Sequence, residues 1–203
     1  MGKKSKTKGS GFERDIAKAI IKKFVPHLEA KEAYNLVHRT PLSGGHVERG
    51  DLICKPPILK YFPWFVECRN REVWTWKQIW EQGQDSVVLR WFYEDAIEKC
   101  HPYDHNDSPT HHRWPLLLFT KNFRKVYAVV TERDAETWFA DDLEEGYSLQ
   151  DVLGCPVMRV YIDKPLFKGY VVIADFDSFL ALHDGVYGTV IQHEIDEYLG
   201  KVD

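Results

Sequence analysis

One short apolar run that carries two charged residues places the strongest constraint on the fold of this chain. Residues 64–69 read Trp-Phe-Val-Glu-Cys-Arg, so the run is apolar on both of its faces. This pattern is typical of a central strand, which is covered on both sides of its sheet. Burying an unpaired carboxylate costs roughly 2 kcal/mol or more, so Glu67 needs a partner. Residues two apart on a strand share a face, which makes Arg69 a candidate.

Periodicity and turn residues predict helices and strands along the rest of the chain. We expect helices over residues 12–24, 76–100 with a break near Gly83, 134–139, 177–182 and 192–199. We expect strands over residues 34–39, 51–54, 64–69, 114–120, 126–131, 158–162 and 170–174. Residues 55–57 are expected to turn the chain. The order predicts an α/β fold, a mixed central sheet flanked by helices.

Charge is distributed unevenly along the sequence. Residues 1–60 carry 10 Lys and 3 Arg against 6 acids, a net of +7, whereas the remainder carries 14 basic and 25 acidic residues, a net of −11. Residues 1–10 are expected to form a flexible basic tail. The basic front favours a polar partner met on one side, and a solvated tail on an ordinary domain is the alternative.

The cysteines and the apolar runs bear on the compartment. Cys54, Cys68, Cys100 and Cys155 form no CxxC pair, and their wide spacing favours free thiols in a reducing compartment. No apolar run is long enough to span a membrane, and the N-terminus lacks the core of a signal peptide. We therefore expect a protein without membrane contact, in the cytoplasm or elsewhere inside the cell.

Three acids on separate predicted elements could gather one hard metal ion. Glu13 lies in the first helix, Asp51 opens the second strand and Glu67 lies in the third. Mg²⁺ prefers carboxylate oxygen and water, and it polarises a phosphodiester while lowering the pKa of a bound water. Arg69 could hold the phosphate or stabilise developing negative charge, while Cys68 points into the core. A structural Glu67–Arg69 ion pair is the alternative.

Four short motifs in order resemble the PD-(D/E)xK nuclease superfamily. They are Gly11-Phe12-Glu13-Arg14, Arg39-Thr40-Pro41-Leu42-Ser43-Gly44-Gly45, Gly50-Asp51-Leu52-Ile53 and Glu67-Cys68-Arg69. Their order and spacing, over about residues 8–95, are most similar to the Holliday junction resolvases of archaea and their viral relatives. The resemblance implies a restriction-endonuclease-like nuclease core over 11–100. Residues 101–203 would then supply the remainder of the sheet and a C-terminal α/β extension of the same domain.

The resemblance also implies roles for single residues. Glu13, Asp51 and Glu67 would bind Mg²⁺, for which Mn²⁺ can substitute, helped by the carbonyl of Cys68. With Arg69 they would form the catalytic set. Residues that would lie near the DNA are Arg39, Ser43 and Gln78. The implied activity is cleavage of DNA, including four-way junctions, by a homodimer.

Two residues depart from the family pattern. Gly50 stands where Pro is usual, and Arg69 stands where Lys is usual. Arg cannot readily release a proton, although it can clamp a phosphate through two hydrogen bonds. An inactive DNA-binding descendant therefore stays open, as does a restriction or repair nuclease that acts on duplex DNA.

Other polar and aromatic segments could have either a functional role or an ordinary structural one. Cys100, His105 and His111 or His112 could bind zinc, although a polar loop is favoured. His46 and Glu48 could touch substrate, although an exposed loop is favoured. The spacing of Trp74, Trp76, Trp80 and Trp91 favours helix and core positions over base stacking. The acidic run Asp141, Asp142, Glu144 and Glu145 is expected to be a solvated turn.

Overall fold

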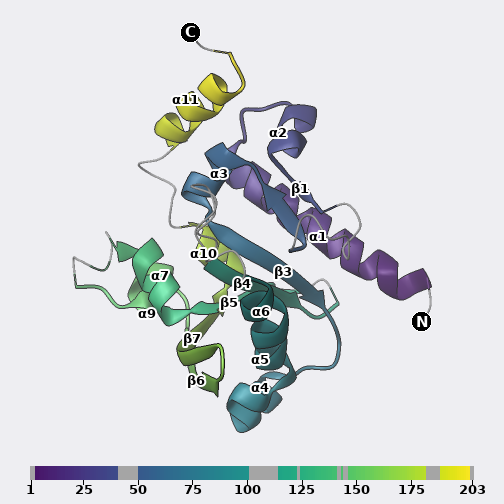
Figure 1. Ribbon diagram of the computed structural model, residues 1–203, viewed down its shortest axis with the longest axis vertical. Helices are drawn as coiled ribbons and strands as arrows, with labels where there is room; N and C mark the ends of the chain where they lie inside the picture. The colour runs from purple at the N-terminus through teal and green to yellow at the C-terminus, as the bar shows by residue number, and fades with distance from the viewer. Residues whose placement is uncertain are drawn as a thin grey trace.

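A five-stranded mixed sheet lies at the centre of the protein, with helices on both of its faces (Figure 1). The computed structural model describes residues 3–40, 50–100, 114–122, 124–140, 143, 146–181 and 188–201. In spatial order the strands are Trp64–Asn70 (β3), Trp114–Thr120 (β4), Tyr127–Thr131 (β5), Phe167–Asp175 (β7) and Met158–Lys164 (β6). β3 and β4 are parallel, and the other neighbours are antiparallel. The predicted fold class is confirmed.

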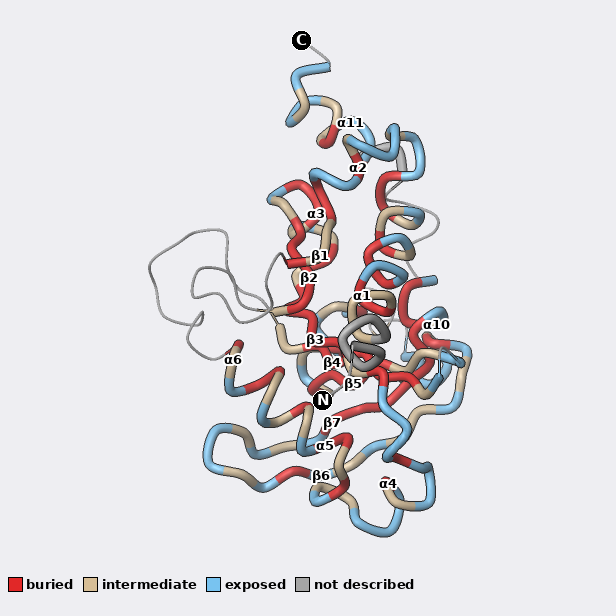
Figure 2. The backbone as a smooth tube through the Cα atoms, turned by 90° about the vertical axis from the view of Figure 1, so that its right-hand side faces the viewer, coloured by how far each residue is buried: buried red, intermediate tan, exposed pale blue. Residues whose placement is uncertain are grey.

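Alternate residues of the strands bury two separate hydrophobic clusters, one on each face of the sheet. Val66 and Leu116 belong to the first cluster, whereas Leu117 and Val129 belong to the second. The buried backbone in Figure 2 accordingly runs through the strands at the centre. β3 is therefore covered on both faces, as its apolar run predicts.

Each face has its own set of helices. The first face packs against Lys3–Phe24 (α1), Pro56–Tyr61 (α3), Glu132–Trp138 (α7), Leu149–Leu153 (α9), Phe176–Ala181 (α10) and Gly188–Tyr198 (α11). The second face packs against Trp76–Gln82 (α4), Val87–Trp91 (α5) and the π-helical turn Phe92–Ile97 (η2). A 3₁₀ turn, Gly83–Asp85 (η1), separates α4 from α5, and Glu98–Cys100 (α6) follows η2. The predicted break near Gly83 is thereby confirmed.

A second, two-stranded sheet lies beside the first. Val37–Arg39 (β1) pairs antiparallel with Leu52–Cys54 (β2), after the helix Ala30–Leu36 (α2). The predicted strand over residues 34–39 was wrong in its first half, because Ala, Lys and Glu at the start of α2 favour a helix that runs on to Leu36. The predicted turn at 55–57 instead opens α3, since Pro is compatible with the first helical positions.

The N-terminal segment differs from its predicted secondary structure. α1 begins at Lys3, so the backbone of residues 3–10 is helical where a flexible tail is expected. Lys is a good helix former, and these residues continue the register of the amphipathic helix that Phe12 and Ile16 anchor in the core. No helix among the described residues is long and apolar enough to cross a bilayer.

Candidate active site

Asp51 lies against the edge of β3 that is not paired with β4. Its backbone N–H donates to the carbonyl of Val66 at 2.9 Å. Its carboxylate Oδ2 accepts from the backbone N–H of Cys68 at 2.7 Å. Asp51 thus continues the hydrogen bonding of the sheet with one backbone and one side-chain contact. This pair of bonds fixes its carboxylate beside the charged half of β3.

The residue before Asp51 has a conformation that explains one departure from the family pattern. Gly50 has a φ of 90°, and a Cβ there would lie 3.1 Å from the Phe65 ring. Pro holds φ near −65°, so it cannot occupy this position. The hydroxyl of Thr40 donates to the Gly50 carbonyl at 2.8 Å and helps to hold the approach to Asp51. Gly50 is therefore required by the local backbone.

Glu67 is almost completely buried and lies between two cations. Its side chain is 2% exposed, with Arg69 Nη2 3.2 Å from Oε2 and Lys99 Nζ 3.0 Å from Oε1. Burial and then the nearby charge of Asp51 raise the pKa of Glu67 to about 7, although Lys99 and Arg69 oppose the shift. The predicted shared face of Glu67 and Arg69 is confirmed, and an ion pair joins them.

The guanidinium of Arg69 is surrounded by protein oxygen atoms. Nη1 lies 2.9 Å from the Cys68 carbonyl and 3.4 Å from Asp51 Oδ2. Nε and Nη2 lie 3.0 and 2.5 Å from Oδ2 of Asp95, which belongs to η2. With its contact to Glu67, each of the three nitrogens of Arg69 faces at least one protein oxygen.

Glu13 approaches the same region from the other face of the sheet. It lies on α1, is nearly buried and pairs with Arg39 of β1. Burial raises the pKa of the Cys68 thiol well above its ordinary value, and the charges of Asp51, Glu13 and Glu67 add to this. Cys68 points into the core, as expected. The charges of all three acids therefore affect the pKa of the same thiol.

Asp51, Glu67 and Cys68 present the oxygen atoms that could bind a metal ion. Among the residues described here, no group of three or more His, Cys, Asp or Glu side chains is arranged to hold a metal. Arg69 lies between Asp51 and Glu67. Yet these two carboxylates and the Cys68 carbonyl all face one cationic group. Such oxygen donors suit Mg²⁺, provided that the guanidinium withdraws.

The structure describes only some of the other predicted residues. Gln78 on α4 accepts a hydrogen bond from the Thr75 hydroxyl at 3.0 Å, so its side chain serves the start of that helix. Trp74 is buried, but Trp76 and Trp80 are 39% and 77% exposed, so the core prediction was wrong for both. Some predictions concern residues outside the described part of the chain: Ser43, His46, Glu48, His105, His111, His112, Asp141, Asp142, Glu144 and Glu145.

Sequence reasoning missed Asp95 and Lys99. Their side chains lie 3.4 Å apart, four positions from one another along η2 and α6. That spacing resembles an ordinary helix-surface pair. Asp95 contacts Arg69 across 26 positions of the chain, and Lys99 contacts Glu67 across 32. No local sequence pattern predicts contacts over such separations.

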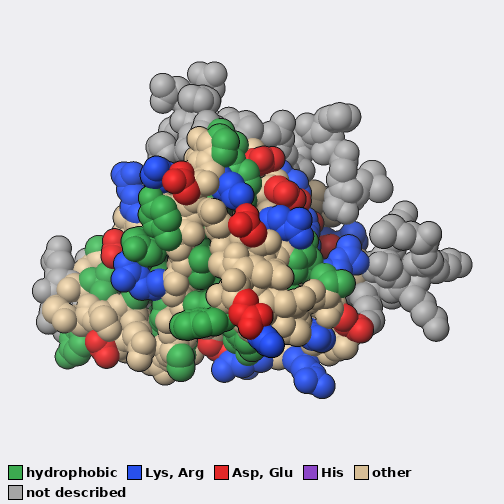
Figure 3. Space-filling view, turned by 90° about the horizontal axis from the view of Figure 1, so that it is seen from below, with side chains coloured by type: hydrophobic (Ala, Val, Ile, Leu, Met, Phe, Trp, Pro, Cys, Tyr) green, Lys and Arg blue, Asp and Glu red, His purple; other side chains and the backbone are tan. Residues whose placement is uncertain are grey.

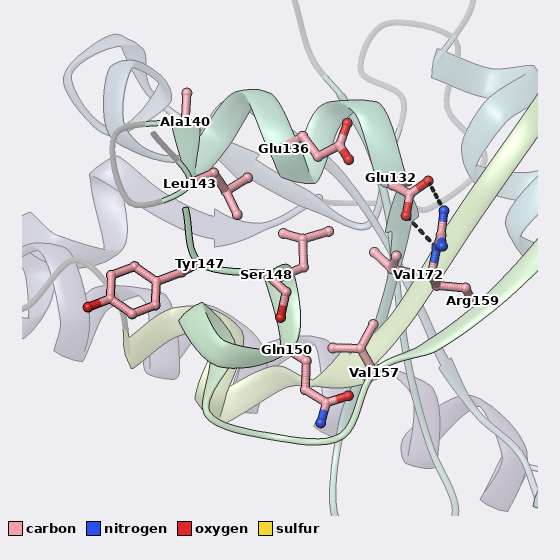
Figure 4. Close-up of a pocket in the computed structure, with 11 residues that line it drawn as sticks. Glu132, Glu136, Ala140, Leu143, Tyr147, Ser148, Gln150, Val157, Arg159 and Val172 are labelled. Carbon is pink, nitrogen blue, oxygen red and sulfur yellow. Dashed lines mark hydrogen bonds and ion pairs between the residues drawn. The ribbon is translucent and has the colours of Figure 1, made fainter. Parts of the chain in front are cut away.

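One hollow of the described surface is lined by none of the three acids. A pocket of about 740 Å³ lies between α7, α9 and the β6–β7 hairpin, and the ion pair of Glu132 with Arg159 forms part of its wall (Figure 4). On the face that carries α4 and β6, basic and acidic side chains are interspersed (Figure 3). Neither feature has the carboxylate arrangement found at β3.

A comparison with protein families identifies a match over most of the chain. The family model described as "Phage putative PDDEXK endonuclease" matches residues 4–152, more than half of the chain. The match includes Glu13, Asp51, Glu67, Asp95 and Lys99. No curated protein and no solved structure matches this chain.

Proposed function

Because this chain belongs to the phage PDDEXK endonuclease family, we propose that it is a Mg²⁺-dependent endonuclease that hydrolyses phosphodiester bonds in branched DNA. One observation carries the proposal beyond the family. Asp51, Glu67 and the Cys68 carbonyl direct oxygen atoms at a single cation beside the edge of the central sheet. The sequence resemblance to junction resolvases supports branched DNA as the substrate. It also supports a homodimer, since a symmetrical junction needs two cuts.

The protein side of the mechanism follows from the contacts. Asp51, Glu67 and the Cys68 carbonyl would hold the ion, with Glu13 completing the acidic set. When bound, Mg²⁺ supplies positive charge that polarises the phosphodiester and lowers the pKa of a water molecule. Asp51 needs no rearrangement, because the Cys68 N–H and the Val66 carbonyl already fix it. Glu67 must be ionised to act as a ligand, and an adjacent divalent cation favours that form.

Arg39 and Ser43 are proposed to lie beside the DNA phosphate. Arg39 is partly exposed, with 30% of its side chain accessible, while it pairs with Glu13. It can therefore keep the acid in place and still present charge to solvent. The net charge of +7 over residues 1–60 would add attraction to the phosphate backbone.

A second candidate function is an inactive DNA-binding module. The position of Arg69 favours it, because a guanidinium between Asp51 and Glu67 offsets part of their negative charge without a metal. A nuclease that acts on duplex DNA is a third candidate. It shares the site and differs in the surfaces that meet the substrate.

A panel of DNA forms separates the three candidates. Purified protein would be incubated with four-way junction, flap, single-stranded and duplex DNA, with Mg²⁺ or with a chelator. The proposal predicts Mg²⁺-dependent cuts, fastest in the junction. Equal rates on linear duplex would favour the restriction or repair type. Binding to DNA without cleavage of any form, in Mg²⁺ and in Mn²⁺, would favour the inactive module.

A further inference from the structure

The cations beside Glu67 differ in how fully protein atoms already engage them. Arg69 has five N–H groups, and its three nitrogens make five contacts to oxygen atoms of four residues. It therefore has no N–H group left for a phosphate while these contacts stand. Held in this way, Arg69 positions the carboxylates, and when a metal displaces it from Asp51 and Glu67 its contacts to Asp95 would remain.

Lys99 is arranged differently. Its ammonium contacts Glu67 at 3.0 Å and Asp95 at 3.4 Å. An ammonium has three N–H groups, so within the described part of the chain one remains for another acceptor. The side chain of Lys99 is 40% exposed, twice the 20% of Arg69. Lys99 is thus the cation of this cluster that faces solvent, where a DNA phosphate would arrive.

The helix that carries Lys99 is irregular at this point. η2 is π-helical from Phe92 to Ile97, inside a helical stretch that starts at Val87. Turns of this kind inside helices frequently occur at functional sites. Phe92, Ala96 and Ile97 stay in the core while Asp95 reaches Arg69 and Lys99 reaches Glu67. The irregular turn therefore directs one acid and one base at the charged half of β3.

We propose that Lys99 is a catalytic residue that contacts the scissile phosphate. This inference rests on the proposed nuclease function. Three carboxylates, Asp51, Glu67 and Asp95, face two cations in the cluster, so one negative charge is in excess when all are ionised. A divalent ion and one phosphodiester would bring the total to zero. Lys99 then stabilises the negative charge that grows on the non-bridging oxygens during attack.

The test compares substitutions at Lys99 with a matched lysine. Lys77 forms a similar four-residue pair with Glu81 on α4, but it is 79% exposed and has no contact with the acids. Single-turnover cleavage of junction DNA would be measured for wild type, K99M, K99R and K77M. DNA affinity in Ca²⁺ and Mn²⁺ affinity without DNA would be measured for the same four proteins.

We expect K99M to cut about 100-fold more slowly or worse, with DNA affinity within a few-fold of wild type. K99R should recover most of the rate because the positive charge returns, and K77M should match wild type. K99M should also bind Mn²⁺ several-fold more tightly, since a like charge beside Glu67 is removed.

Two results would overturn the role of Lys99 and leave the nuclease standing: K99M that cuts as fast as wild type, or a slow K99M that K99R does not restore. A slow K99M with unchanged Mn²⁺ affinity and a large loss of thermal stability would also count against it. Wild-type protein that cuts no DNA form would overturn both proposals at once.

Discussion

The two halves of β3 share one neighbouring strand and have opposite chemistry. In the first half, the Trp64 ring lies 5.0–5.3 Å from the rings of Trp114, Trp138 and Phe179. In the second half, Glu67 and Arg69 meet carboxylates and an ammonium from other elements. The aromatic half provides a rigid anchor. The charged half depends on that anchor to hold like charges that would otherwise move apart.

The difference teaches why a buried acid can persist here. A carboxylate such as Glu67 is costly to bury, and its pKa of about 7 reflects that cost. Close packing of the aromatic half and pairing with β4 fix the backbone on which the acid is carried. Perturbed acids of this kind concentrate at functional sites.

The largest effect should come from the charged half. Asp51→Asn keeps an oxygen that can accept from the Cys68 N–H, so the fold should be unchanged. It removes the charge that a metal needs, which should raise the barrier by roughly 4 kcal/mol or more, about a thousandfold in rate. Cleavage and DNA binding would be measured beside Asp85→Asn, an exposed acid that pairs with Lys164. An Asp51→Asn protein as fast as wild type would place the activity elsewhere.

The aromatic half should govern stability. Trp64→Ala removes a ring that is 2% exposed and should lower the free energy of unfolding by about 3–5 kcal/mol. Denaturant unfolding would measure this, with Trp80→Ala as the control. Trp80 is 77% exposed, so its loss should change stability by about 0.5 kcal/mol or less. Equal losses for both variants would show that the ring cluster is not the anchor.

A smaller effect should appear in the pH dependence of stability in metal-free protein. The pKa of Glu67 rises from 4.5 to about 7 on folding, so the folded state holds a proton that the unfolded chain has released between these values. The free energy of unfolding should then fall as pH rises through this interval, by at most about 3 kcal/mol. Glu67→Gln should flatten that part of the curve. Parallel curves for the two proteins would contradict the raised pKa of Glu67.

Much of this arrangement follows from sequence because its signals are local. The apolar run at residues 64–69 predicts a central strand, and the period of two places Glu67 and Arg69 together. Glu13 and Asp51 came from motifs whose spacing resembles that of a known superfamily. Glu67 and Arg69 lie in β3, Glu13 lies in α1, which begins earlier than predicted, and Asp51 directly precedes β2, where the predicted strand includes it.

The features that the sequence did not predict depend on contacts between distant segments. Asp95 and Lys99 look like a surface pair until the helix is packed against β3, and Trp80 has core spacing but faces solvent. The five contacts of Arg69 also come from four residues on several elements. The residue type alone therefore could not predict whether its N–H groups are free to bind a phosphate.

The most direct measurement of the central claim is the position of a bound metal. A crystal of the protein soaked in Mn²⁺ would be measured at a wavelength where manganese scatters anomalously. We predict a peak between Asp51 and Glu67, within bonding distance of the Cys68 carbonyl, with the Arg69 guanidinium displaced toward Asp95. A peak confined to residues 101–112, with Arg69 still between Asp51 and Glu67, would contradict the assignment of the metal to the edge of β3.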